Sequence, residues 1–220
     1  MVCPQCDGIE REFNSDVARR QLRDFRRRGP DRTTRILIQE IERRGVDHRT
    51  VLDIGGGIGA IQMALLEAGA ERAASVDASS AYDSAAEEEA RRRGWADRIT
   101  RVHGDFVGVA EAVEAADIVT LDRVICCYPD VEALVDLSAA HAQWLYGLVY
   151  PRRTWWLRPA FRLANVILRL RGSSFRAFLH PPEVVEAVVE RNGLRRVFLQ
   201  FVGIWQVAVY ARGRPAAGGA

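Results

Sequence analysis

The chain has 220 residues, of which 48% are hydrophobic and 27% are charged, a composition that suits one domain with a sizeable core. Its formal net charge of +2 does not indicate a nucleic-acid-binding protein. The sequence contains 31 Arg and no Lys. No apolar run reaches the roughly 18 residues of a membrane span, and the N-terminus lacks a signal-peptide pattern. We therefore expect a cytoplasmic protein with reduced cysteines.

Two Arg-rich helices are expected before the first strand, over Ser15–Arg28 and Asp31–Arg44. A Gly-Pro pair separates them, and the Asp31 side chain can cap the second helix. We expect residues 1–45 to form an N-terminal helical cap.

Apolar runs then alternate with helical patterns over residues 46–212. The expected strands are Thr50–Gly55, Ala73–Ala78, Ile99–Asp105, Asp117–Asp122, Leu145–Tyr150, Arg196–Val202 and Trp205–Tyr210. This alternation predicts a single α/β domain with a Rossmann-like, doubly wound, mostly parallel seven-stranded sheet. For the last two strands, antiparallel pairing is an alternative. Residues 213–220 are expected to form a disordered tail.

A glycine-rich turn follows the first strand, in the stretch VLDIGGGIGA. Gly55, Gly57 and Gly59 allow a sharp turn and a close approach of the backbone to a ligand beyond the carboxyl end of the strand. Read loosely, the stretch also fits a dinucleotide-binding pattern, and a strand–helix turn without a ligand is a further alternative.

Carboxylates occur at the ends of successive expected strands. Asp53 precedes the first glycine by two residues and suits a positively charged ligand better than a pyrophosphate. Asp77 lies 24 residues after Asp53 (77 − 53), where a ribose-binding acid is expected, and Asp105 follows in the stretch HGDF. A series of acids at neighbouring strand ends favours a binding site over solvated strand termini.

These motifs resemble those of the class I S-adenosylmethionine-dependent methyltransferases. VLDIGGGIG, SVDAS, VHGDF and DRVICCYPD resemble four successive motifs of that family, and the likeness spans about residues 30–210. The resemblance implies that Gly55, Gly57 and Gly59 contact the methionine part of S-adenosylmethionine, that Asp77 binds the ribose, and that Asp53 orients the loop near the amino group. It also implies that Asp105 and Phe106 hold the adenine. The remaining residues of the predicted cofactor site are Ala78, Gly104 and Asp122.

A looser likeness connects two segments to magnesium-protoporphyrin O-methyltransferases. Residues 11–35 and 175–196, including the Leu179-His180 pair, resemble that family. The cysteines depart from its pattern. We therefore expect methyl transfer to a small-molecule acceptor whose identity and acceptor atom the sequence does not define. An NAD(P)-dependent oxidoreductase and a non-catalytic cofactor- or metal-binding module are the alternatives.

A basic insertion separates the fifth strand from the late helix, and we expect residues 151–181 to form a helical lid. From Pro151 to Pro182 the chain has seven Arg and no acidic residue. Arg158, Arg162 and Arg169 share one face of the expected helix, and apolar residues share another. This pattern favours contact with an anionic, apolar substrate. A solvated helix and peripheral contact with an anionic membrane surface remain alternatives.

His180, after the lid, is the candidate acid or base, and Tyr128 and Tyr150 are expected at strand ends facing the cleft. A carboxylate acceptor needs no base.

Four cysteines form two pairs, Cys3 with Cys6 and Cys126 with Cys127. The helices before the sheet are expected to cross its cofactor end, which would bring the pairs together. If residues 126–127 are extended, their side chains point in opposite directions and only one enters the cleft. The alternatives are packed thiols, a zinc site, and a disulfide or redox-active thiols.

Overall fold

The computed structural model describes residues 4–213. Its strands are β1 Thr50–Ile54, β2 Arg72–Asp77, β3 Ile99–His103, β4 Ala116–Asp122, β5 Ala142–Pro151, β6 Leu194–Val202 and β7 Trp205–Arg212. Its α-helices are α1 Pro4–Glu12, α2 Ser15–Arg28, α3 Arg32–Glu42, α4 Ala60–Glu67, α5 Ser80–Arg93, α6 Phe106–Val109, α7 Val131–His141, α8 Leu157–Leu170 and α9 Pro182–Arg191. Short 3-10 turns connect several of them.

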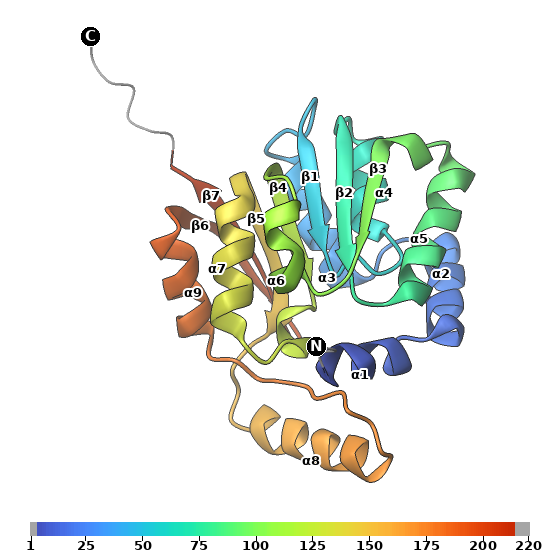
Figure 1. The fold of residues 1–220 in the computed structure, drawn as a ribbon. Helices are drawn as coiled ribbons and strands as arrows, with labels where there is room; N and C mark the ends of the chain where they lie inside the picture. Colours follow the sequence, from blue (N-terminus) through green and yellow to red (C-terminus); the bar gives the residue numbers. More distant parts are fainter. Residues whose placement is uncertain (1–3, 214–220) are drawn as a thin grey trace.

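The strands form one sheet in the order β3-β2-β1-β4-β5-β7-β6 (Figure 1). β1 to β5 run parallel, and β7 is antiparallel to both β5 and β6. The predicted seven-stranded, mostly parallel α/β fold is confirmed. The strand order reverses between β1 and β4, and in such sheets the crevice at the carboxyl ends of these strands is the usual ligand site.

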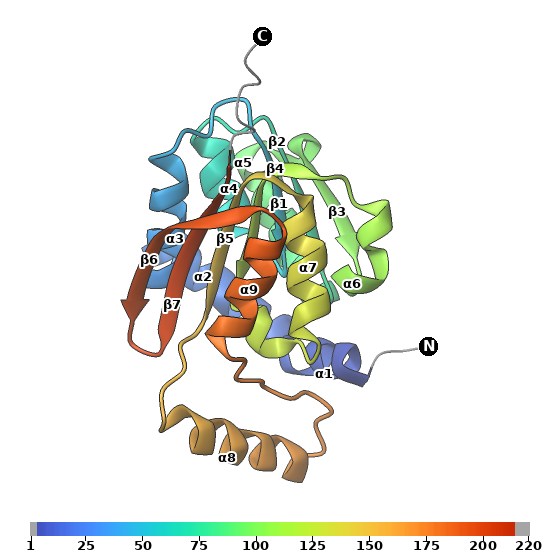
Figure 2. The same cartoon turned by 90° about the vertical axis from the view of Figure 1, so that its left-hand side faces the viewer.

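Helices cover both faces of the sheet (Figures 1 and 2). α6, α7 and α9 pack on one face through a core that includes Leu134, Val185 and the β5 residue Tyr146. α3 and α4 pack on the other, where Leu37 and Met63 are completely buried. The central strands are therefore apolar on both sides, which explains why they appear in the sequence as continuous apolar runs.

α1 lies below the carboxyl ends of the parallel strands, and α2 lies beside α5 (Figure 1). Asn14 caps α2, and Asp31 caps α3 by accepting bonds from two backbone N–H groups. The Arg26 guanidinium on α2 contacts Glu88 and Glu89 on α5 at 2.8 and 2.9 Å. The sequence predicted α2 and α3 but missed α1. The proposed division at residue 45 and the tail remain predictions, and most of the tail lies outside the described residues.

The insertion after β5 contains α8, which protrudes from the body beyond the same end of the sheet (Figures 1 and 2). Two hydrogen bonds of 2.8 Å between Asn165 and the backbone of Ala177 tie the helix to the returning chain. Leu157 is its buried residue. No helix within residues 4–213 has the length and apolar character to cross a membrane.

Candidate active site

The glycine loop joins β1 to α4 at the centre of the crevice. Gly55 and Gly57 have φ angles of 64° and 54°, which L-residues with side chains rarely adopt. A Cβ atom on Gly55 would lie 2.4 Å from the Val124 side chain, whereas one on Gly57 would meet no atom within 4 Å. Gly55 therefore allows the loop to pack against the segment after β4, and Gly57 leaves its backbone open toward the crevice.

Asp53 lies at the base of this loop, where it is almost completely buried and forms part of the cavity wall. Its carboxylate accepts hydrogen bonds from Thr120 Oγ1 at 2.7 Å and from Gln62 Nε2 at 3.2 Å. Burial raises the Asp53 pKa to about 7, and the nearby Asp122 and Asp77 add to that effect. The predicted role of Asp53 in orienting the loop fits these contacts.

Asp77 ends β2 and points into the crevice. Its two oxygens accept bonds of 2.9 Å from the backbone N–H groups of Gly57 and Ser79. Burial raises the Asp77 pKa to about 6, although these two bonds favour the ionised form. The carboxylate thus fixes the glycine loop while retaining lone pairs for a ligand.

Residues after β3 form the neighbouring part of the wall. Gly104 has a φ of 148°, and Asp105 caps the short helix α6 through a bond of 3.2 Å to Val107 N. Tyr128 donates its hydroxyl hydrogen to the other Asp105 oxygen at 2.9 Å. Phe106 is mostly buried in the core but still reaches the cavity.

A charge network closes the crevice at the end of β4. Arg123 has an unusual φ of 63°, and its guanidinium contacts Asp122 at 3.0 Å and Asp31 at 2.5 Å. Thr34 on α3 donates a short hydrogen bond to Asp122. Burial raises the Asp122 pKa. For Asp31 burial acts in the same direction, but the attraction of Arg123 and the hydrogen bonds from Thr34 and Thr33 together outweigh it and lower the pKa. The network ties α3 to the cofactor end of the sheet.

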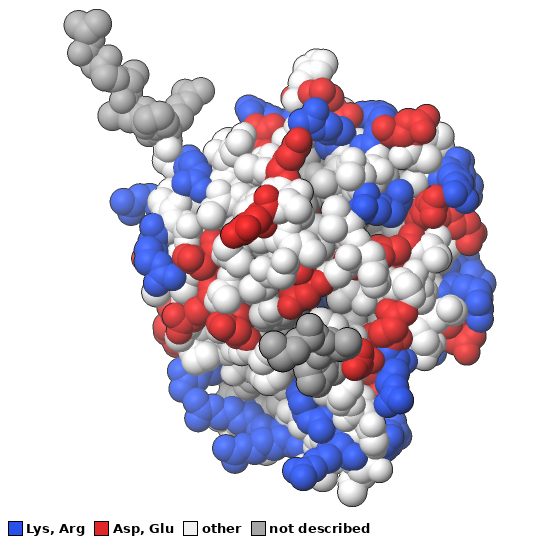
Figure 3. Space-filling model, viewed as in Figure 1, with Lys and Arg blue, Asp and Glu red and all other residues white. Residues whose placement is uncertain are grey.

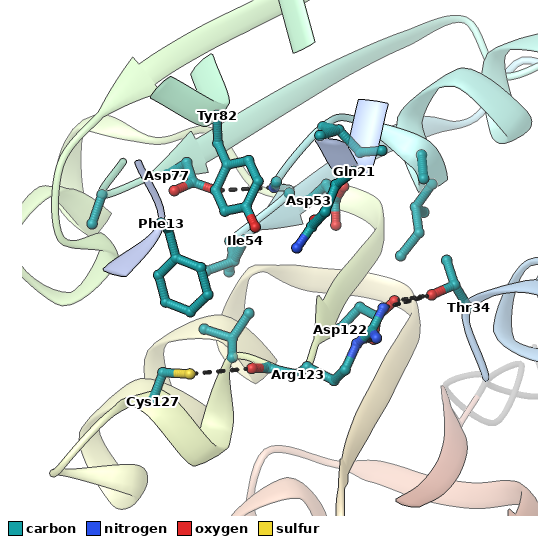
Figure 4. A pocket seen from close by; sticks show the side chains of 18 of the residues that line it. Phe13, Gln21, Thr34, Asp53, Ile54, Asp77, Tyr82, Asp122, Arg123 and Cys127 are labelled. Carbon is teal, nitrogen blue, oxygen red and sulfur yellow. Dashed lines mark hydrogen bonds and ion pairs between the residues drawn. The ribbon is translucent and has the colours of Figure 1, made fainter. Parts of the chain in front are cut away.

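These elements enclose a cavity of about 830 Å³ (Figure 4). Asp77, Tyr82 and Phe13 lie on one side, and Asp122, Arg123 and Cys127 lie on the other (Figure 4). All ten residues of the predicted cofactor site line this cavity except Gly59. These nine residues are Asp53, Gly55, Gly57, Asp77, Ala78, Gly104, Asp105, Phe106 and Asp122.

Several wall residues were not predicted. Phe13 lies in the turn between α1 and α2, Gln21 on α2 and Tyr82 on α5, and the rings of Phe13 and Tyr82 are 5.7 Å apart. Burial raises the Tyr82 pKa to about 12. Arg123 was also missed, because one of its two partners, Asp31, is far away in the sequence and was interpreted only as a helix cap. The position of Arg123 directly after Asp122, at the end of a predicted strand, was the one feature of the sequence that could have indicated its place in the site.

The three candidate acid–base residues are in different environments. Tyr128 lines the cavity. His180 is half-buried, with Nε2 2.8 Å from the Tyr128 carbonyl oxygen, and burial lowers its pKa. Tyr150 does not face the cleft as expected, because its ring is buried in the core with Tyr210. Neither His180 nor Tyr150 contributes to the cavity wall formed by the described residues.

The cysteine pair after β4 is not extended. Ile125–Cys127 form a 3-10 turn, so the two sulfur atoms lie 3.9 Å apart instead of pointing in opposite directions. The N-terminal segment reaches this turn, because the Gln5 side chain donates to the Cys127 carbonyl oxygen at 2.7 Å. Cys6 and the pair line the same cavity, whereas Cys3 lies outside the described residues. Residues 4–213 contain no group of three or more potential metal ligands, so a zinc site is not supported.

Comparison with known proteins yields one family and a set of similar folds. Residues 52–139 match the model of a methyltransferase domain. No curated protein sequence matches the chain significantly.

The fold resembles magnesium protoporphyrin IX methyltransferase from Synechocystis PCC 6803 with bound SAH, with a TM-score of 0.69 at 19% identity. This likeness covers 93% of this chain and 98% of that one. An O-methyltransferase family protein from Burkholderia thailandensis has a TM-score of 0.68 at 16% identity, covering 93% of this chain and 62% of that one. An O-methyltransferase family 2 protein from Planctomyces limnophilus in complex with apigenin has a TM-score of 0.59 at 17% identity, covering 84% and 63% of the two chains.

The oxidoreductase and non-catalytic alternatives find no support in these comparisons. The matched region contains β1 to β4 and therefore the glycine loop and the strand-end acids described above. Residues 52–139 therefore match a methyltransferase domain, within a fold that the chain shares with methyltransferases of known structure.

Proposed function

We propose that the protein transfers a methyl group to a carboxylate of a small, largely apolar acid. The observation that carries this proposal is the cavity of about 830 Å³ between the sheet and the N-terminal helices. Small-molecule sites commonly range from about 300 to 1,000 Å³, so this cavity has room for a cofactor and an acceptor together.

The residues on the sheet side of the cavity fit S-adenosylmethionine. We assign the Asp77 carboxylate to the ribose hydroxyls, because it is buried, accepts only backbone bonds and faces the cavity. The open backbone at Gly57 suits the methionine part, and Asp105 with Phe106 suits the adenine. The bound cofactor supplies the methyl group on a positively charged sulfur, which the nearby carboxylates favour.

The helix side of the cavity suits the acceptor. Ile9, Phe25 and Trp205 give it apolar surface, while Arg28 and Arg35 bring positive charge to its edge. Arg35 donates to the Pro30 carbonyl oxygen at 2.9 Å, whereas Arg28 forms no ion pair within residues 4–213. We assign Arg28 to the acceptor carboxylate, because a guanidinium binds such a group through two parallel hydrogen bonds.

A carboxylate acceptor also accounts for the acid–base residues. Neither His180 nor Tyr150 reaches the cavity, and a carboxylate is already ionised at neutral pH. The chain then accelerates transfer mainly by holding the acceptor oxygen in line with the methyl group and by excluding water. Tyr128 serves to orient Asp105 rather than to remove a proton.

The acceptor class is tested by following formation of S-adenosylhomocysteine with a panel of planar apolar acids and their amides. Magnesium protoporphyrin IX, named for the similar Synechocystis enzyme, carries propionate carboxylates on an apolar ring and is the first acceptor to test.

We expect turnover with acids and none with the matching amides. Arg28→Gln should raise the acceptor KM about tenfold or more with little change in cofactor affinity, since a charge-assisted bond contributes about 1.5–3 kcal/mol. Arg27→Gln, on an exposed part of the same helix, is the matched control. Equal turnover of acids and amides would refute the carboxylate assignment while leaving the cofactor assignment intact.

A further inference from the structure

We propose that α8 is an interfacial helix that docks the protein on an anionic lipid surface. One side of the helix contacts the rest of the chain, a second side carries Arg side chains, and the outer side is apolar. Leu163, Val166, Ile167 and Leu170 are spaced i, i+3, i+4 and i+7 and therefore share one face. They are 62%, 53%, 42% and 82% exposed, so nothing in residues 4–213 covers this face.

The opposite side of α8 holds the helix on the protein. Leu157 is buried, and Asn165 exchanges two hydrogen bonds with Ala177. At about 100° per residue, both residues lie well away from the face that carries Leu163. These contacts, which include those with the returning chain of the insertion, leave the apolar face of α8 pointing outward. From the sequence we predicted one apolar face and one Arg face for this helix, and not a second, exposed apolar face.

A stripe of arginines separates these two faces along one side of α8. Arg158, Arg162 and Arg169 are all exposed and are spaced i, i+4 and i+11. A helix that lies in a membrane interface has this arrangement, because the apolar face enters the acyl boundary while guanidinium groups remain among the phosphates. Trp155 and Trp156, 85% and 42% exposed, extend the surface at the start of the helix, as interfacial aromatic residues do.

Charge selects an anionic lipid over other partners. The segment from Pro151 to Pro182 carries seven Arg and no acidic residue, and Arg side chains gather over α8 in Figure 3. A second copy of the chain would bring the same arginines to a two-fold interface, where like charges repel. Nucleic acid would satisfy the arginines but would leave the apolar face in water. A bilayer with anionic headgroups satisfies both.

Docking through α8 would orient the active site toward the bilayer. α8 lies beyond the end of the sheet at which the parallel strands point toward the cavity (Figure 1). The segment after α8 also reaches the cavity wall, because Gln5 bonds to the Arg176 backbone at 2.9 and 3.1 Å and to the Cys127 carbonyl oxygen. An apolar acceptor that partitions into lipid would then be concentrated near the active site.

The test is co-sedimentation of the full chain with vesicles of equal parts phosphatidylcholine and phosphatidylglycerol, compared with phosphatidylcholine alone. We expect binding to the anionic vesicles that weakens with salt, together with a blue shift of tryptophan fluorescence. Leu163→Glu/Ile167→Glu should abolish binding, and Val197→Glu, at an exposed apolar position on β6, is the matched control.

Replacement of Arg158, Arg162 and Arg169 together with Gln should weaken binding by about a hundredfold, since each Arg near an anionic surface contributes roughly fivefold. The same replacements at Arg20, Arg23 and Arg27, exposed on α2, should have a smaller effect. Thermal melting confirms that each variant is folded. Failure of the wild-type chain to bind anionic vesicles overturns the proposal. So does unchanged vesicle binding in the α8 variants, or a dimer in sedimentation velocity that the Leu163→Glu/Ile167→Glu change dissociates.

Discussion

Replacement of Asp77 by Asn should separate cofactor binding from stability. The carboxylate accepts 2.9 Å bonds from Gly57 N and Ser79 N and lies almost completely buried in the cavity wall. Asn keeps the size of the side chain but removes its charge, and its amide nitrogen cannot accept from one of the two backbone N–H groups. Two charge-assisted bonds to the ribose would become neutral bonds.

The magnitude follows from the bond types. A hydrogen bond to a charged group contributes about 1.5–3 kcal/mol and a neutral one about 0.5–1.5 kcal/mol, so two bonds lose about 2 kcal/mol in total. Affinity for S-adenosylhomocysteine should therefore fall about thirtyfold. The stability of the ligand-free protein should change little. Ionised Asp77 is unfavourable without a ligand, as its raised pKa of about 6 indicates, and relief of this cost offsets the hydrogen bond that one backbone N–H group loses.

Isothermal titration calorimetry with S-adenosylhomocysteine measures the first quantity, and urea unfolding of the ligand-free protein measures the second. Ser80→Ala, at the start of the following helix α5, serves as a control that leaves the carboxylate in place. Unchanged affinity in Asp77→Asn would refute the ribose assignment. A large loss of ligand-free stability would instead show that Asp77 acts mainly by holding the glycine loop.

Three further changes test other parts of the site. Burial raises the Asp53 pKa from 3.8 to about 7, so the contribution of this carboxyl group to ligand-free stability is complete below pH 4 and is lost as the pH rises toward 7. Urea unfolding across this range should show a smaller decrease in Asp53→Asn than in the wild type, and the raised pKa of Asp77 accounts for part of the decrease that remains. Glu89→Gln removes the buried carboxylate that pairs with Arg26, Arg92 and Arg93 and leaves Arg26 only its contact with Glu88, so urea unfolding should show a loss of about 2 kcal/mol. Limited proteolysis should cut α2 faster, whereas equal proteolysis would contradict a docking role. Tyr128→Phe removes the 2.9 Å bond to Asp105 and should weaken S-adenosylhomocysteine less than tenfold in calorimetry, with a larger loss indicating direct contact.

The parts of the fold that the sequence predicted depend on local patterns. Buried parallel strands are continuous apolar runs, and the residue type at each strand end is visible directly in the sequence. Gly55 and Gly57 are recognisable because only glycine adopts their φ angles easily. The sheet, the glycine loop and the acids Asp77 and Asp105 were therefore predictable before any contact was known.

The missed features depend on contacts between distant segments. α1 includes Gly8, which disfavours a helix by propensity, yet a Cβ there would lie 2.3 Å from the Phe175 backbone nitrogen. The glycine is needed for close packing across the fold, which no local pattern shows. The pairing of Arg123 with Asp31 is of the same kind. Tyr150 was misplaced because a strand-end position does not determine which face its side chain occupies.

The charges at the strand ends explain why this crevice suits a cationic cofactor better than a pyrophosphate. Burial raises the pKa values of Asp53, Asp77 and Asp122, so each carboxylate is held at an energetic cost in the ligand-free protein. Arg123 offsets this cost only in part, because Asp31 shares its charge. The local field therefore remains negative beside a backbone left open at Gly57. A pyrophosphate would add repulsion to this field, whereas a ligand with a sulfonium and an amino group would stabilise the ionised carboxylates. We therefore expect the same acids that make the empty site unfavourable to favour S-adenosylmethionine over a dinucleotide.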